Sequence, residues 1–206
     1  MALTQTLGVG TAALVSQAVG RKDPDDANLV FNQSLVLAAI CLAATLIGGY
    51  ALTEGYMRAI AADTATADAG ISYLYWFLPG LALQYVSIVM MSALRGTGVV
   101  QPTMIVQMVT VLLNIVLAPV LIAGIGTGRP LGVAGAGLAS TISVAAGVVL
   151  LSFYFVRLEK YVHFRAGLWA PRFAAWGRML NIGLPAGGEF ALMFIYMAVI
   201  YWVIRD

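Results

Sequence analysis

The sequence predicts an all-α fold, a polytopic bundle of about six membrane-spanning helices. Three observations predict it: 61% of the 206 residues are hydrophobic, only 10% are charged, and the mean hydropathy is +0.92. A soluble domain is about 45–50% apolar and about 25% charged. This chain has too few polar side chains to cover a water-facing exterior, so its surroundings are expected to be hydrocarbon.

Six apolar segments approach or reach the roughly 20 residues that cross a bilayer. They are residues 2–19, 28–52, 69–94, 101–123, 131–156 and 179–204. The breaks between them combine charge with glycine or proline, or contain a polar run, as helix ends do. The longest breaks are residues 53–68 and 157–178.

Basic residues predict the orientation, because cytoplasmic loops carry an excess of Lys and Arg. One side of the predicted bundle holds Arg21, Lys22, Arg95, Arg157, Lys160, Arg165, Arg172 and Arg178. The other side holds Arg58, Arg129 and Arg205. This bias places the loop 157–178 in the cytoplasm and residues 1 and 206 on the external side of a plasma (inner) membrane.

The first segment, residues 2–19, is a poor span because it contains Thr4, Gln5, Thr6 and Gln17. It has neither a charged leader nor a clear cleavage site, so it is not a signal peptide. A weak helix that enters from outside is expected to be the second helix of something longer. The chain is therefore predicted to be an internal fragment.

Small residues cluster in two of the predicted spans, at residues 7–20 and 131–147. Lipid provides no hydrophobic drive between helices, so close backbone approach through small residues is a main source of their association. These two helices are expected to pack inside the bundle.

One carboxylate lies within a predicted span, at Glu189. The other eight lie in the breaks or at the end of the chain: Asp23, Asp25, Asp26, Glu54, Asp63, Asp68, Glu159 and Asp206. A charge at mid-bilayer costs about 2.5–3.5 kcal/mol on insertion scales, so Glu189 is expected to face a cavity or a partner. Such a carboxylate can be protonated, hold a cation or pair with a cationic substrate, which is the chemistry of an antiporter.

Four residues near Glu189 are candidates for the same site. Pro185 has no N–H to donate to the carbonyl of Asn181. This free carbonyl is expected to coordinate a cation, or the break in the helix to act as a hinge. Met193 and Tyr196 follow Glu189 on the same helical face and offer thioether and aromatic surface to a lipophilic cation. Ordinary packing is the alternative for both.

Three amide side chains within the apolar spans are further candidates for a cavity or a hinge: Gln33, Gln84 and Asn114. Hydrogen bonding between helices is the favoured alternative for each. Catalytic residues, metal ligands and a cofactor are not predicted, and the chain is not expected to be an enzyme. The net charge of +2 gives no indication of a nucleic-acid partner, and the single Cys41 cannot form an internal disulfide.

Four phrases in order resemble the MATE family of multidrug and toxic-compound extrusion transporters. They are "AALVSQAVGRKD" (12–23), "SALRGTG" with "QPTM" (92–104), "NIVLAPVLIAGIGTGRPLGVAGAGLASTIS" (114–143) and "IGLPAGGEF" (182–190). The resemblance implies a two-lobe fold of twelve helices, of which this chain has a part. Residues 1–156 would be helices two to six of the first lobe, 157–178 the cytoplasmic inter-lobe loop, and 179–206 the first helix of the second lobe.

The resemblance also implies export of an organic compound in exchange for a cation by alternating access. Two positions depart from the family pattern: many members have Asp or Asn where this chain has Ala118, and some place the carboxylate of the seventh helix at the position of Met193.

The leading hypothesis is a fragment of a transporter that exports lipophilic organic cations in exchange for Na⁺ or H⁺. Its expected partners are membrane lipid, the organic cations and the remainder of the transporter chain. A related lipid-linked precursor flippase is an alternative, disfavoured because no basic residue lies mid-span. A non-functional truncated transporter is the other.

Overall fold

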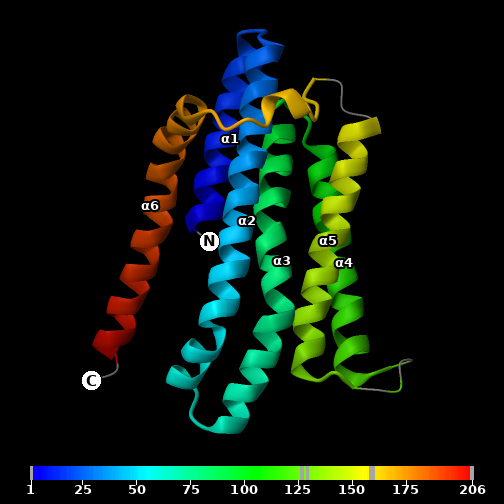
Figure 1. Cartoon of the computed structure of the whole chain (residues 1–206), viewed down its shortest axis with the longest axis vertical. Helices are drawn as coiled ribbons and strands as arrows, with labels where there is room; N and C mark the ends of the chain where they lie inside the picture. Colours follow the sequence, from blue (N-terminus) through cyan, green and yellow to red (C-terminus); the bar gives the residue numbers. More distant parts are fainter. Residues whose placement is uncertain (1, 126–127, 129, 158–160, 205–206) are drawn as a thin grey trace. The chain divides into compact units, whose positions relative to one another are not determined.

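The computed structural model describes residues 2–125, 128, 130–157 and 161–204, without the side chains of 190–191, 194, 198–199 and 201–204. Six α-helices and one 3-10 helix form the described chain (Figure 1). They are α1 (Ala2–Gly20), α2 (Pro24–Ile60), α3 (Thr64–Gly96), α4 (Gln101–Ala123), α5 (Val133–Arg157), η1 (Ala166–Leu168) and α6 (Phe173–Ile204). The prediction of an all-helical chain with six long helices is confirmed. Several residues named in the predictions lie outside the described residues: Met1, Arg129, Glu159, Lys160, Arg205 and Asp206.

The predicted break at residues 53–68 is wrong for most of its length. Helix α2 continues to Ile60 and α3 begins at Thr64, so only three residues separate them (Figure 1). Glu54 and Arg58 pair at 3.7 Å across one turn of this stretch, which stabilises the helix locally. Polarity here marks where the helices leave the apolar layer, not where they end.

Side-chain caps start two of the helices. Asp23 accepts a hydrogen bond from the backbone N–H of Asp26 at 3.0 Å, and Pro24 occupies the first position of α2, where its missing N–H costs little. Asp63 caps α3 in the same way, accepting the N–H of Thr66 at 2.7 Å. Helix α6 begins at Phe173, six residues before the predicted span.

Four of the helices, α2 to α5, are long and apolar enough to cross a membrane by length and composition. The first helix, α1, has 19 residues and carries the polar residues that made it a poor predicted span. These helices, with the apolar composition, identify a multi-pass membrane protein.

The chain divides into two compact units. Unit 1 comprises Met1–Leu37, Ile88–Val99 and Glu159–Asp206, and unit 2 comprises Ala38–Ser87 and Val100–Leu158. The core of unit 1 is a buried cluster of Leu14, Val15, Val30 and Met179, contributed by α1, α2 and α6.

Small residues allow close helix contacts in unit 2, where α4 packs against α5. A Cβ on Gly135 of α5 would lie 2.7 Å from the carbonyl oxygen of Leu121 on α4. A Cβ on Gly137 would lie 2.6 Å from the carbonyl oxygen of Tyr73 on α3. The expectation that residues 131–147 pack inside a bundle agrees with these contacts.

A proline interrupts the hydrogen bonds of α3 in unit 2. Pro79 has no N–H, so the carbonyl of Tyr75 loses its partner within the helix. The hydroxyl of Tyr50 on α2 donates a 3.2 Å hydrogen bond to this carbonyl. A second helix thus supplies the donor that hydrocarbon cannot.

The next turn of α3 is held by a hydroxyl from α5. The N–H of Gly80 donates to the Oγ1 of Thr141 at 3.0 Å, and this hydroxyl donates to the carbonyl of Trp76 at 2.5 Å. In an uninterrupted helix Gly80 would bond Trp76 directly. The position is open to Thr141 because a Cβ on Gly80 would lie 2.8 Å from its Cα.

Candidate functional site

One side of α6 is fixed against α1 by glycines. A Cβ on Gly183 would overlap the carbonyl oxygen of Thr6, and one on Gly187 would overlap its Oγ1. On the other partner, a Cβ on Gly10 would lie 2.6 Å from the carbonyl oxygen of Met179. The backbones of α1 and α6 therefore approach more closely than larger side chains permit.

The predicted site residues share a different side of α6. At about 100° per residue, Glu189 lies about 200° around the helix from Gly187 and so faces away from α1. Pro185, Met193 and Tyr196 are spaced four, four and seven residues from Glu189 and lie on its face. Met193 is 52% exposed and Tyr196 is 64% exposed, so this face is uncovered within the described chain.

Glu189 itself is exposed, as is Asn181 two turns before it. Within the part of the chain that the structure describes, no hydrogen bond or ion pair to the Glu189 carboxylate is formed. Pro185 lies inside α6 and cannot donate to the carbonyl of Asn181. The face thus presents one unpaired carboxylate with thioether and phenol groups along a single helix.

Charged groups hold the start of α6, before its apolar part. Arg178 donates to the Oδ1 of Asp26 at 2.8 Å, and Arg21 donates to its Oδ2 at 2.6 Å. Asp26 lies in the first turn of α2, ahead of the apolar stretch 28–52. The hydrogen bond from Arg178 is the main cause that lowers the pKa of Asp26 below 3.8, its usual value. A carboxylate in this position joins the ends of α1, α2 and α6.

The three predicted amides lie elsewhere in the described chain. Gln33 is fully buried in unit 1, where its amide group binds the backbone of residues 168–172. Asn114 donates a 3.2 Å hydrogen bond to Ser140, which links α4 to α5 in unit 2. Gln84 is half-buried on α3, in the same unit. The predicted residues of α6 share one helix face, and the three amides lie on other helices.

Sequence reasoning missed the residues that orient this face. Gly183 and Gly187 are four residues apart, a spacing that indicates close helix packing in membranes. That signal was available in the phrase "IGLPAGGEF". The pairing with Thr6 and the bond between Asp26 and Arg178 join positions more than 150 residues apart, and no local pattern marks them.

The family model MatE matches residues 1–120 of the chain. The chain belongs to the MATE family. The curated relatives of this MATE chain include a probable multidrug resistance protein NorM of Bacillus licheniformis, 30% identical over 196 residues. That match covers 93% of the chain and 43% of the relative. An FAD transporter of Shewanella oneidensis is 24% identical, with 87% of the chain and 40% of the relative covered.

Solved structures show the same fold. A MATE protein in complex with MaD3S superposes with a TM-score of 0.87 at 27% identity, covering 95% of this chain and 44% of that one. A MOP superfamily transporter from Pyrococcus furiosus gives a TM-score of 0.84 at 27% identity, covering 95% and 43%. The MATE chain spans less than half the length of the relatives it matches. Those relatives are transporters, and they indicate no enzymatic activity.

Proposed function

We propose that this MATE chain is part of a secondary transporter that exports lipophilic organic cations in exchange for Na⁺ or H⁺ by alternating access. The unpaired carboxylate of Glu189 on the exposed face of α6 is the observation that carries the proposal. Coupling needs one group for which the driving ion and the substrate compete, and a carboxylate without a fixed partner can serve both in turn.

The surroundings of Glu189 support a cationic, lipophilic substrate. Met193 and Tyr196 place a polarisable sulfur and an aromatic ring one and two turns from the carboxylate, on the same face. A lipophilic cation needs this combination, because its charge pairs with the acid while its apolar body contacts the thioether and the ring. The names of the Bacillus relatives, probable multidrug resistance proteins, support the same substrate class.

The packing of α6 supports a fixed direction for this face. Gly183 and Gly187 lie against Thr6, so rotation of α6 about its axis would drive larger side chains into the α1 backbone. The carboxylate is therefore held away from α1. In the proposed transporter this direction is a water-reachable cavity in the plasma (inner) membrane, and the loop 157–178 is cytoplasmic.

Efflux of a fluorescent lipophilic cation tests the proposal. The natural gene product that carries this chain is expressed in cells lacking their own major multidrug exporters, and ethidium efflux is followed under imposed Na⁺ and proton gradients. Glu189→Gln should abolish gradient-driven efflux, because the amide cannot exchange protons or hold a cation by charge. Glu54→Gln is the matched control, since Glu54 is an exposed glutamate on α2 that pairs with Arg58.

Two results would count against the proposal. Efflux by the Glu189→Gln variant at the parent rate, under both gradients, would remove Glu189 from coupling. Parent cells that retain ethidium as long as cells with an empty vector would remove the transport assignment. Immunoblots must show that the parent and the Glu189→Gln variant are present in the membrane in equal amounts before their efflux rates are compared.

A further inference from the structure

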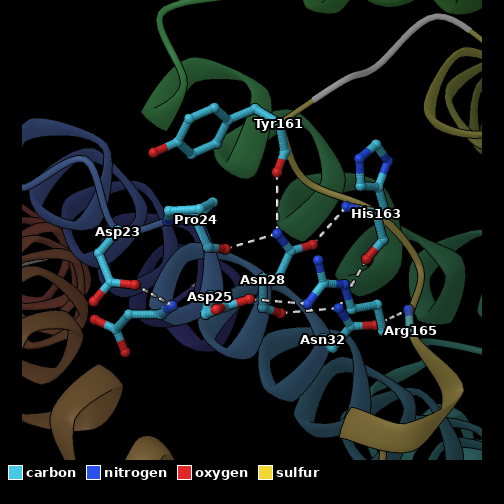
Figure 2. A network of polar contacts seen from close by, with 9 residues as sticks. Asp23, Pro24, Asp25, Asn28, Asn32, Tyr161, His163 and Arg165 are labelled. Carbon is cyan, nitrogen blue, oxygen red and sulfur yellow. Dashed lines mark hydrogen bonds and ion pairs between the residues drawn. The ribbon is translucent and has the colours of Figure 1, made fainter.

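Three amide side chains of α2 are buried against the segment that precedes α6. Asn28 is 1% exposed, and Asn32 and Gln33 are fully buried. They lie within two turns at the start of α2 and face residues 161–172, which we name the strap. Figure 2 shows the first two amides with the strap backbone beside them.

Asn28 and Asn32 bind the strap as a neighbouring β-strand would. Asn28 donates to the carbonyl of Tyr161 at 3.0 Å and accepts the N–H of His163 at 2.8 Å. Asn32 donates to the carbonyl of His163 at 2.9 Å and accepts the N–H of Arg165 at 2.9 Å. A side-chain amide carries the same donor and acceptor as a peptide group, so alternate strap residues are paired along their backbone (Figure 2).

Gln33 continues the pairing further along the strap. Its Nε2 donates to the carbonyls of Leu168 and Ala170 at 2.6 and 2.8 Å. Its Oε1 accepts the N–H of Arg172 at 2.8 Å. Helix α6 begins at the next residue, Phe173, so the amide of Gln33 binds the residues directly before this helix.

The same side-chain atoms of the two asparagines form second hydrogen bonds. The Nδ2 of Asn28 donates to the carbonyl of Pro24 at 2.7 Å, and that of Asn32 donates to the carbonyl of Asn28 at 2.9 Å. The Oδ1 of Asn32 accepts a second bond, from the indole N–H of Trp169 at 3.0 Å. Loss of the strap would leave buried amide groups unpaired, which costs about 1–3 kcal/mol for each group.

Strap side chains between the paired positions point to the protein. Val162 is fully buried, and the ring of Phe164 lies 5.5 Å from that of the buried Phe31 on α2. The backbone groups of Tyr161, His163 and Arg165 bind the amides, while Val162 and Phe164 supply apolar contact. The guanidinium of Arg165 also binds Asp25 at 3.1 Å. The bonded backbone groups thus belong to every second residue, as along one edge of a β-strand.

We propose that Asn28, Asn32 and Gln33 form a docking site for the strap that recognises its backbone and thereby fixes where α6 begins. The occupant is the chain's own segment 161–172, which includes the 3-10 helix η1 (Ala166–Leu168). The strap is then an ordered part of unit 1 and not a flexible linker. Replacement of the His163 side chain is tolerated, but loss of its backbone N–H is not.

Hydrogen–deuterium exchange on the full chain in detergent tests the proposal. Strap peptides that contain the N–H groups of His163, Arg165 and Arg172 should exchange slowly in the parent protein. Asn32→Leu should speed their exchange roughly tenfold, because each lost bond exposes an amide by local opening. Gln33→Leu should act mainly on Arg172, with Gln101→Leu as the matched control, since Gln101 is an exposed amide at the start of α4.

A pair of strap variants separates backbone from side-chain recognition, even where the α2 variants fail to fold. His163→Ala keeps the backbone N–H that binds Asn28 and should leave exchange at Arg165 within about twofold of the parent. His163→Pro removes that N–H and should raise it roughly tenfold. Equal exchange in the two variants would overturn the proposal, as would parent strap amides that exchange at the rate of an unstructured peptide.

Discussion

Arg178 of α6 binds Asp26 of α2 across 152 residues of chain, with 2.8 Å between the guanidinium and the carboxylate. Arg21, directly after α1, binds the other oxygen of the same carboxylate. One acid thus joins three helix ends, and Gly183 and Gly187 continue the contact of α6 with α1 further along the helix. Unit 1 is held by charge at its polar end and by close backbone packing in its apolar part.

Protonation of Asp26 should weaken unit 1. The bond from Arg178 lowers the pKa of Asp26 in the folded state, so the unfolded state binds more protons at acid pH. The stabilisation is complete above the unfolded pKa, near 3.8, and is lost as the pH falls through the lower folded pKa. Thermal unfolding midpoints between pH 7 and pH 2.5 should fall less steeply for Asp26→Asn than for the parent. A parent slope in Asp26→Asn would show that the ion pairs of this carboxylate do not stabilise unit 1.

Gly183→Ala should destabilise the contact between α1 and α6. The added methyl group would overlap the carbonyl oxygen of Thr6, which is backbone and cannot rotate away. Overpacking of this kind costs about 1–3 kcal/mol, and the thermal unfolding midpoint in detergent should fall accordingly. Gly188→Ala is the control, because a Cβ at Gly188 meets nothing within 4 Å. Equal midpoints for the two variants would show that the close contact does not stabilise the fold.

Thr141→Val should destabilise unit 2 by about 1–3 kcal/mol, because the N–H of Gly80 and the carbonyl of Trp76 lose their shared partner. Thr141→Ser keeps the hydroxyl and should stay within about 1 kcal/mol of the parent. Chemical unfolding in mixed micelles measures both variants. A serine variant as unstable as the valine variant would assign the effect to the methyl group and not to the hydroxyl.

Asn114 and Ser140 should be coupled weakly. Their 3.2 Å hydrogen bond joins α4 and α5, and such bonds between membrane helices contribute about 0.6 kcal/mol on average. A double-mutant cycle with Asn114→Ala and Ser140→Ala should give a coupling energy of about that size. Coupling indistinguishable from zero would leave Asn114 with a packing role only.

The sequence was sufficient to predict the helices but not their polar contacts. Apolar runs predicted six helices, and small residues such as Gly135 predicted close packing, because both depend on the bilayer and on local composition. The prediction of a helix break at 53–68 was wrong because charged residues can mark the membrane boundary without ending a helix. The sequence predicts a cavity or a bond between helices for Gln33, yet its partners are backbone groups of the strap.

Contacts that depend on distant backbone atoms have no pattern in the residues alone. Thr141 is one of several hydroxyl residues in α5, and only the fold brings it to the turn after Pro79. The alignment of Pro185, Glu189, Met193 and Tyr196 was predictable from helical spacing. Which side α1 would cover depended on Thr6, more than 170 residues earlier, and could not be predicted.

The amide triad on α2 has a consequence for tracing this feature among related chains. Because the amides bind main-chain groups, the residue at 163 can vary among related chains without loss of these bonds. Arg165 differs, since its side chain also pairs with Asp25. The sequence pattern that identifies this feature is instead the spacing of Asn28, Asn32 and Gln33, in which two amides lie one turn apart and a third follows directly. Relatives that keep those three amides are expected to keep the backbone path of the strap, even where the strap sequence differs.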